Sequence, residues 1–186
     1  MTVSEQNWGK WFVSEFVLPT LNEPDALRTL GRLREWINPS DGITPKPFEG
    51  WLHTALAVRI EEAGFRILIN ASENIRPCNE DGHAKAWSPD IWIKENERLE
   101  RPVNVFLKTQ FVAPQECKRD ITKMEHLAKK HKSPGVFVCV AIRPRIEHPK
   151  RWQKFDQEVE RKSREWGCDI EDHAQPWIRV LWRGKD

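Results

Sequence analysis

Hydrophobic residues recur along this chain at two different periods, and the two periods predict an alternation of helices and strands. Apolar residues between positions 50 and 64 follow helical spacing, and Gly64 is typical of a helix end. Three β-rich runs follow, over residues 65–71, 88–93 and 103–109, and polar connections with Pro, Gly, Asn or Asp separate them. The middle of the chain is therefore predicted to form one helix followed by three strands.

The C-terminal part continues the alternation. After Pro114, apolar residues recur at spacings of four, three and four and predict an amphipathic helix. Residues 136–142 form a continuous apolar run, which is typical of a strand covered on both faces. A last helix with Trp166 on its apolar face ends near Gly167, and residues 177–182 predict a closing strand. The fold class is α/β (α+β), with helices packed on a mixed sheet.

The first 47 residues differ from the rest, because they predict only helices. Two apolar helical faces carry Trp8, Trp11, Phe12 and Phe16, and then Leu27, Leu30, Leu33, Trp36 and Ile37. A linker over residues 38–47, with three prolines and a glycine, ends this pair. We expect residues 1–47 to pack as a helical pair on a core domain formed by residues 48–186.

One pair of predicted strands carries residues that suggest chemistry. Asp90 lies in the run Ser-Pro-Asp-Ile-Trp-Ile, and Lys108 lies in Val-Asn-Val-Phe-Leu-Lys-Thr-Gln, which ends at Gln110. Side chains alternate between the faces of a strand, so Lys108 and Gln110 share a face with Asn104 and Phe106. Lysine among hydrophobic strand residues is rarely fully buried unless it is paired. We therefore interpret this face as polar and as a candidate site.

These residues resemble the PD-(D/E)XK nuclease superfamily, whose restriction-endonuclease-like fold the order of predicted elements also matches. In that family an Asp on one strand and an acid-x-Lys on the next assemble a magnesium site for phosphodiester hydrolysis. The resemblance places Asp90 at the first acid, where it would bind Mg²⁺, and Lys108 at the lysine, while Phe106 stands in place of the second acid. It further implies a contribution from the preceding helix, where His53 lies, with Glu49 one turn earlier, and Gln110 completes the catalytic candidates.

The missing second acid leaves three interpretations open. The first is a degraded metal site, kept for binding nucleic acid or a protein partner in DNA processing, mobile elements or defence. The second is an active Mg²⁺-dependent endonuclease with a rearranged acid, for which Glu49, Glu62, Glu116 and Asp120 are the candidates. The third is a protein-interaction module without enzymatic activity, in which the Trp-rich N-terminal helices form the contact surface.

Charge is segregated along the chain, although the net charge is only +2. Residues 118–164 hold 14 Lys/Arg against 6 Asp/Glu, which leaves a net −6 on the remainder. Such a segment can contact phosphates, and it can equally form the solvated faces of two amphipathic helices. The candidate nucleic-acid contacts are Lys118, Arg119, Lys123, Arg143, Arg145, Lys150 and Arg151.

Four dispersed cysteines, one of them in the apolar run, suit free thiols in a reducing cytoplasm better than a disulfide framework. Cys78/His83 and Cys168/His173 both show Cys-x4-His spacing, but this is wider than a zinc knuckle, and we interpret both as unrelated loops rather than a zinc site. The start of the chain has no basic segment followed by an apolar one, and the longest apolar run is far short of a membrane span. We expect a cytoplasmic protein without membrane contact.

Overall fold

The computed structural model describes residues 7–36, 46–69, 89–109, 114–145 and 149–185. The chain begins with the helical segments α1 (Trp8–Phe12), η1 (Val13–Val17), α2 (Leu18–Asn22), α3 (Pro24–Trp36) and α4 (Lys46–Glu62). The strands β1 (Ile67–Ile69), β2 (Ile91–Ile93) and β3 (Val103–Thr109) follow. The remaining elements are α5 (Pro114–His131), β4 (Gly135–Ile142), α6 (Pro149–Trp166), β5 (Asp169–Asp172) and β6 (Ile178–Lys185).

In this described part, six strands form one mixed sheet in the order β1-β2-β3-β4-β6-β5. Strands β3 and β4 are parallel, with Lys108 opposite Cys139, and every other pairing is antiparallel. Helix α5 makes the crossover between the parallel pair, as a parallel connection requires. All of β4 is buried, which confirms the prediction that the continuous apolar run is a strand covered on both faces.

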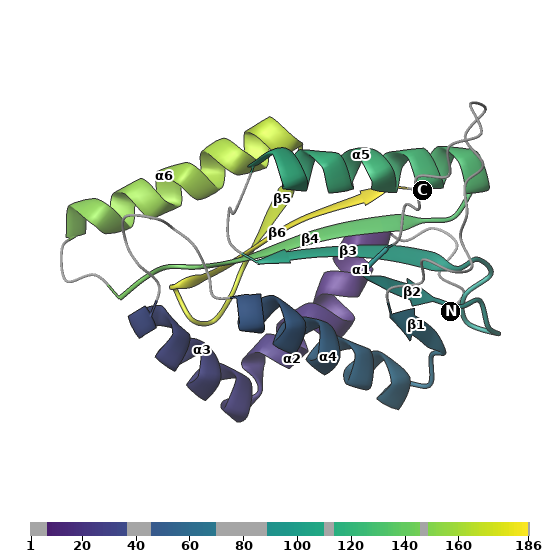
Figure 1. Cartoon of the computed structure of the whole chain (residues 1–186), viewed down its shortest axis with the longest axis horizontal. Coiled ribbons are helices and arrows are strands. Elements are labelled where there is room, and N and C mark those ends of the chain that lie inside the picture. Colours follow the sequence, from purple (N-terminus) through teal and green to yellow (C-terminus); the bar gives the residue numbers. More distant parts are fainter. Residues whose placement is uncertain (1–6, 37–45, 70–88, 110–113, 146–148, 186) are drawn as a thin grey trace.

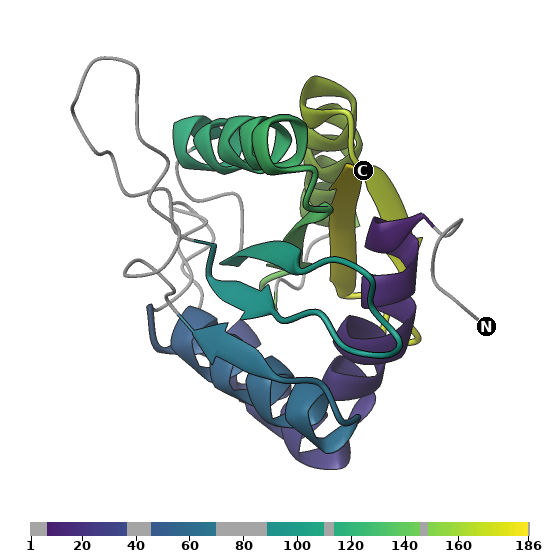
Figure 2. The ribbon, with the colours of Figure 1, turned by 90° about the vertical axis from the view of Figure 1, so that its right-hand side faces the viewer.

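Helices cover both faces of the sheet. Figure 1 shows α5 and α6 on one side of the strands and α2, α3 and α4 on the other, and Figure 2 shows the same separation after a quarter turn. Leu52, Leu56 and Ile60 of α4 are fully buried against the sheet, and each contributes about 1.5–3 kcal/mol of burial free energy. A second apolar cluster, with Met124, Leu127 and Val159, fills the space under α5 and α6.

The side chains of β3 alternate between these two clusters. Val103, Val105 and Leu107 point into the cluster under α4, and Phe106 points into the cluster under α5 and α6. Our interpretation of the Phe106 face as polar is wrong, because Asn104 is 2 % exposed and Phe106 is 1 % exposed. Helices α5 and α6 bury this face, and the sequence of β3 alone could not show that they do. Within β3, only Lys108 is partly accessible.

The N-terminal helices contribute to the same core as the sheet. Phe12, Phe16 and Leu21 belong to the cluster that contains the inward side chains of β3 and β4. Helix α1 can approach β6 closely because Gly9, which has no side chain, lies against the Trp182 ring. The helix widens at η1, where the Leu18 N–H donates to the Val13 carbonyl five residues back. This π-type turn directly precedes a proline, which has no N–H to continue the regular pattern.

Helix α4 and strand β5 depart most from the predictions. Helix α4 begins at Lys46 rather than residue 50 and so includes the end of the predicted linker, because proline is tolerated in a first helical turn. Strand β5 was not predicted, since its sequence Asp-Ile-Glu-Asp is short, acidic and mostly exposed at the edge of the sheet. The predicted stops are confirmed: Gly64 and Gly167 have φ of 87° and 60°, in the region that favours glycine.

Candidate functional site

Asp90 occupies a bend directly before β2 and is held by the backbone of β3. Its N–H donates to the Val105 carbonyl at 2.9 Å, and its Oδ2 accepts the Leu107 N–H at 2.6 Å. The Asp90 carboxylate and backbone therefore extend the hydrogen bonding between β2 and β3 beyond the last strand pair. Burial raises the pKa of Asp90 above its ordinary value, and this outweighs the opposing effects of the Leu107 N–H, Lys108 and His53.

Lys108 lies at the end of β3 and is surrounded by carboxylates from two helices. Its Nζ is 3.1 Å from Oδ2 of Asp120 on α5 and 3.7 Å from Oε1 of Glu49 on α4. Burial alone would lower the pKa of Lys108, but the negative charges of Asp120, Asp90 and Glu49 together raise it above its ordinary value. Lys108 is therefore a fixed cation, as predicted near Asp90, although its ion pairs are with Asp120 and Glu49.

Asp120 is the member of this ion cluster that the sequence pointed to least clearly. Its side chain is only 6 % exposed, and its second oxygen, Oδ1, is 3.0 Å from Nζ of Lys123. A signal was present, because Asp120 lies three residues after Cys117 and four before Met124, on the buried stripe of the helix. An acid on that stripe needs a buried partner, and Lys108 supplies it. The other candidates for a rearranged acid, Glu62 and Glu116, make no ion pair with Lys108.

His53 and Glu49 lie four residues apart on α4 and so share a face of the helix. The structure brings both to the cluster, since Glu49 pairs with Lys108 and His53 is close enough to lower the pKa of Asp90. His53 Nε2 is buried and makes no hydrogen bond within the described part of the chain. Helices α4 and α5 thus approach the end of β3 from opposite faces of the sheet (Figure 1).

The carboxylates of Asp120 and Glu49 are directed at a lysine rather than at a common metal position. Phe106 stands where the resemblance places a second acid, and its ring is buried among Cys117, Ile121 and Met124. Within the residues that the structure describes, no three Asp, Glu, His or Cys side chains come close enough together to hold a metal ion. Asp120 and Glu49 direct their oxygens at the Lys108 amine instead. Magnesium usually binds several oxygen ligands in octahedral geometry.

The candidate phosphate-contacting residues lie in two separate groups. Lys118, Arg119 and Lys123 are on α5, where Lys118 pairs with Glu165 at 2.7 Å and Lys123 pairs with Asp120. Arg143 and Arg145 follow β4 and contact α3, where Arg145 pairs with Glu35 at 2.7 Å and the Arg143 carbonyl accepts from Arg34 Nε. Arg119 is exposed and has no ion pair among the described residues. The side chains of Lys150 and Arg151 lie outside the described part.

The remaining predicted residues are Gln110 and the two Cys-x4-His pairs. Gln110 and the Cys78/His83 pair lie outside the described residues. Cys168 and His173 flank β5, so our interpretation of this segment as a loop is wrong. His173 Nδ1 accepts the Gln175 N–H at 2.9 Å, and Cys117, Cys139 and Cys168 are buried and form no disulfide among the described residues.

Comparison with known proteins gives no relative from which a role could be transferred: no family model, no curated protein and no solved structure matches the chain. In the described ranges, none of the helices combines the length and the apolar character that spanning a membrane requires.

Proposed function

We propose that this chain is a nucleic-acid-associated protein with a restriction-endonuclease-like core, in which the position of the family's metal site is closed by an ion cluster centred on Lys108. The observation that carries the proposal is the pairing of Lys108 with Asp120 and Glu49 next to Asp90. The first acid and the lysine of the PD-(D/E)XK pattern are thus present and adjacent. The remaining carboxylates neutralise the lysine rather than converging on a common metal position.

Phe106, two residues before Lys108 and on the same face of β3, supports the same interpretation. A phenylalanine that is 1 % exposed belongs to the packing of α5 and α6 against β3, and its removal would open a cavity costing about 3–5 kcal/mol. Phe106 therefore stabilises the fold by packing at the position where the family has a metal-binding acid. A protein that keeps the surrounding fold while losing the ligand set retains surfaces for binding, including the exposed cations of α5.

A binding experiment tests this proposal directly. Fluorescence anisotropy with labelled single-stranded DNA, double-stranded DNA and RNA should show affinity that falls linearly, on logarithmic axes, between about 50 and 200 mM salt. Arg119→Gln should weaken binding to all sequences equally and reduce the salt slope by about 1, because a phosphate contact carries no base information.

Arg66→Gln is the matched control, since Arg66 is also exposed but precedes β1 at the opposite end of the sheet from Lys108. Equal effects of the two changes would place the nucleic acid elsewhere. Absence of binding at low salt would overturn the proposal and favour a protein-interaction module.

The proximity of Asp120 to Lys108 favours one second candidate, a metal-dependent endonuclease in which Asp120 replaces the acid missing at Phe106. Asp90 and Asp120 would then be the residues that hold the metal. Plasmid and single-stranded DNA incubated with Mg²⁺ or Mn²⁺ should remain intact if the cluster is closed. Cleavage that both Asp90→Asn and Asp120→Asn abolish, while the exposed control Asp172→Asn leaves it unchanged, would establish the nuclease instead.

A further inference from the structure

A cleft of about 580 Å³ lies between η1, the C-terminal end of α4 and the turn that joins β2 to β3. It is lined by Trp11, Glu15, Phe16, Arg59, Glu62, Ala63, Phe65 and Arg98, none of which belongs to the Lys108 cluster. Its volume falls within the range of small-ligand sites. Two of these residues, Glu15 and Phe16, belong to the π-type segment η1, and such widened turns often occur at functional sites.

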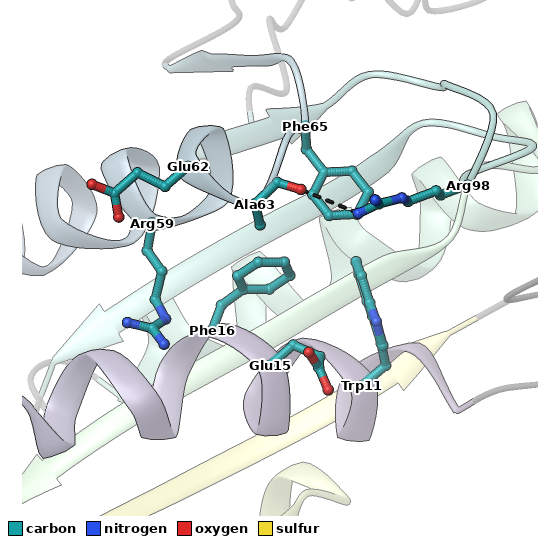
Figure 3. Close-up of a pocket in the computed structure, with 8 residues that line it drawn as sticks. All are labelled: Trp11, Glu15, Phe16, Arg59, Glu62, Ala63, Phe65 and Arg98. Atoms are coloured by element: carbon teal, nitrogen blue, oxygen red, sulfur yellow. Dashed lines mark hydrogen bonds between the residues drawn. The ribbon is translucent and has the colours of Figure 1, made fainter. Parts of the chain in front are cut away.

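Three aromatic rings form the apolar wall of this cleft. Trp11 lies edge-on to Phe16, with ring centroids 5.3 Å apart, and edge-on to Phe65 at 5.9 Å. Phe16 and Phe65 are also perpendicular, at 5.9 Å. Figure 3 shows the three rings grouped together, with Glu15 beside Trp11 and Arg98 beside Phe65. A wall with rings in several orientations offers both faces and edges to an apolar stem that carries a cation.

The charged groups at the rim differ in whether they are already engaged. Arg59 donates to Glu23 at 2.9 Å, and Arg98 donates to the Ala63 carbonyl at 3.3 Å. Glu15 and Glu62 make no ion pair or side-chain hydrogen bond with any residue that the structure describes. Arg59 is neutralised by Glu23, whereas Arg98 keeps its positive charge, so the carboxylates of Glu15 and Glu62 exceed the remaining cation of the lining by one. The carbonyl end of α4, which closes one side, adds partial negative charge from the helix dipole.

We propose that this cleft binds an alkyl guanidinium or alkyl ammonium group, either as a free amine or as an arginine or lysine side chain of a peptide. The apolar stem packs on Trp11, Phe16 and Phe65, and the carboxylates of Glu15 and Glu62 at the rim attract the cation. Aromatic faces and carboxylates attract a cation together, because both present negative charge to it. This inference does not depend on nucleic-acid binding or on the Lys108 cluster.

Ligand-observed NMR and calorimetry on the full chain test it with three probes. Agmatine represents a free amine, acetyl-Gly-Arg-Gly-amide represents a peptide, and the same peptide with citrulline in place of arginine is the neutral isostere. Binding of agmatine or the arginine peptide, at least about tenfold tighter than the citrulline peptide, is expected for a charge-assisted contact. Whichever of the two cationic probes binds identifies the source of the group.

Neighbouring glutamates provide matched variants. Glu62→Gln should weaken binding of the cationic probe by about tenfold, and Glu61→Gln should leave it unchanged, because Glu61 is exposed on the same turn but does not line the cleft. Circular dichroism confirms that both variants fold. Equal effects of the two changes, equal binding of the citrulline peptide, or no binding of either cationic probe would overturn the inference.

Discussion

Breaking the ion pair between Lys108 and Asp120 should destabilise the fold measurably. The two side chains are 15 % and 6 % exposed and their charged atoms are 3.1 Å apart, so water screens the pair weakly. Removal of one partner of a buried pair costs about 3–5 kcal/mol. Because Lys123 remains 3.0 Å from Asp120, we expect the lower end of this range, about 3 kcal/mol, for Lys108→Met. For Asp120→Asn we expect about 2 kcal/mol, because Glu49 remains 3.7 Å from Lys108 and the amide keeps the shape of the side chain.

The double variant shows whether the cost belongs to the pair. Lys108→Met combined with Asp120→Asn should cost about 3 kcal/mol rather than the sum, which is a coupling of about 2 kcal/mol. Urea unfolding followed by tryptophan fluorescence measures all three free energies, and unchanged m-values would show that the comparison is valid. Additive losses of unfolding free energy, or a loss of less than about 1 kcal/mol for Lys108→Met, would refute the view that this buried ion cluster stabilises the fold.

Two further predictions concern the docking of the N-terminal helix and the charge on Asp90. Gly9→Ala places a Cβ 2.3 Å from the Trp182 ring and should lower the free energy of unfolding by about 1–3 kcal/mol. Gly31→Ala in α3 meets nothing within 4 Å and should raise it by about 0.5–1 kcal/mol. Equal responses of the two variants in urea unfolding would contradict the docking of α1 on β6. Because the pKa of Asp90 is raised, the folded state binds its proton more readily than the unfolded state, so the charged form lowers stability at neutral pH. Asp90→Asn should therefore be more stable than the parent at pH 7, with a difference that disappears below about pH 4, and a less stable variant at pH 7 would show that the carboxylate is favourable where it lies.

The sequence predicted correctly those features that depend on a single helix or strand. The period of apolar residues predicted α5 and β4, and the two positive-φ glycines marked the ends of α4 and α6. The neighbourhood of Asp90 and Lys108 followed from adjacent antiparallel strands, whose register is limited by a short connection. By contrast, β5 was missed because a short exposed edge strand has no hydrophobic pattern to reveal it.

The amino-acid sequence by itself determined the kinds of element, their order and the candidate pair Asp90 and Lys108, because these depend on spacing within one or two neighbouring segments. Only the tertiary structure decided which charges surround Lys108, since Glu49 and Asp120 arrive from helices on opposite faces of the sheet. It also decided that the Phe106 face is core, because burial depends on α5 and α6 packing over it. The partners of these side chains come from segments that are distant in the sequence, and no periodic pattern reveals such packing.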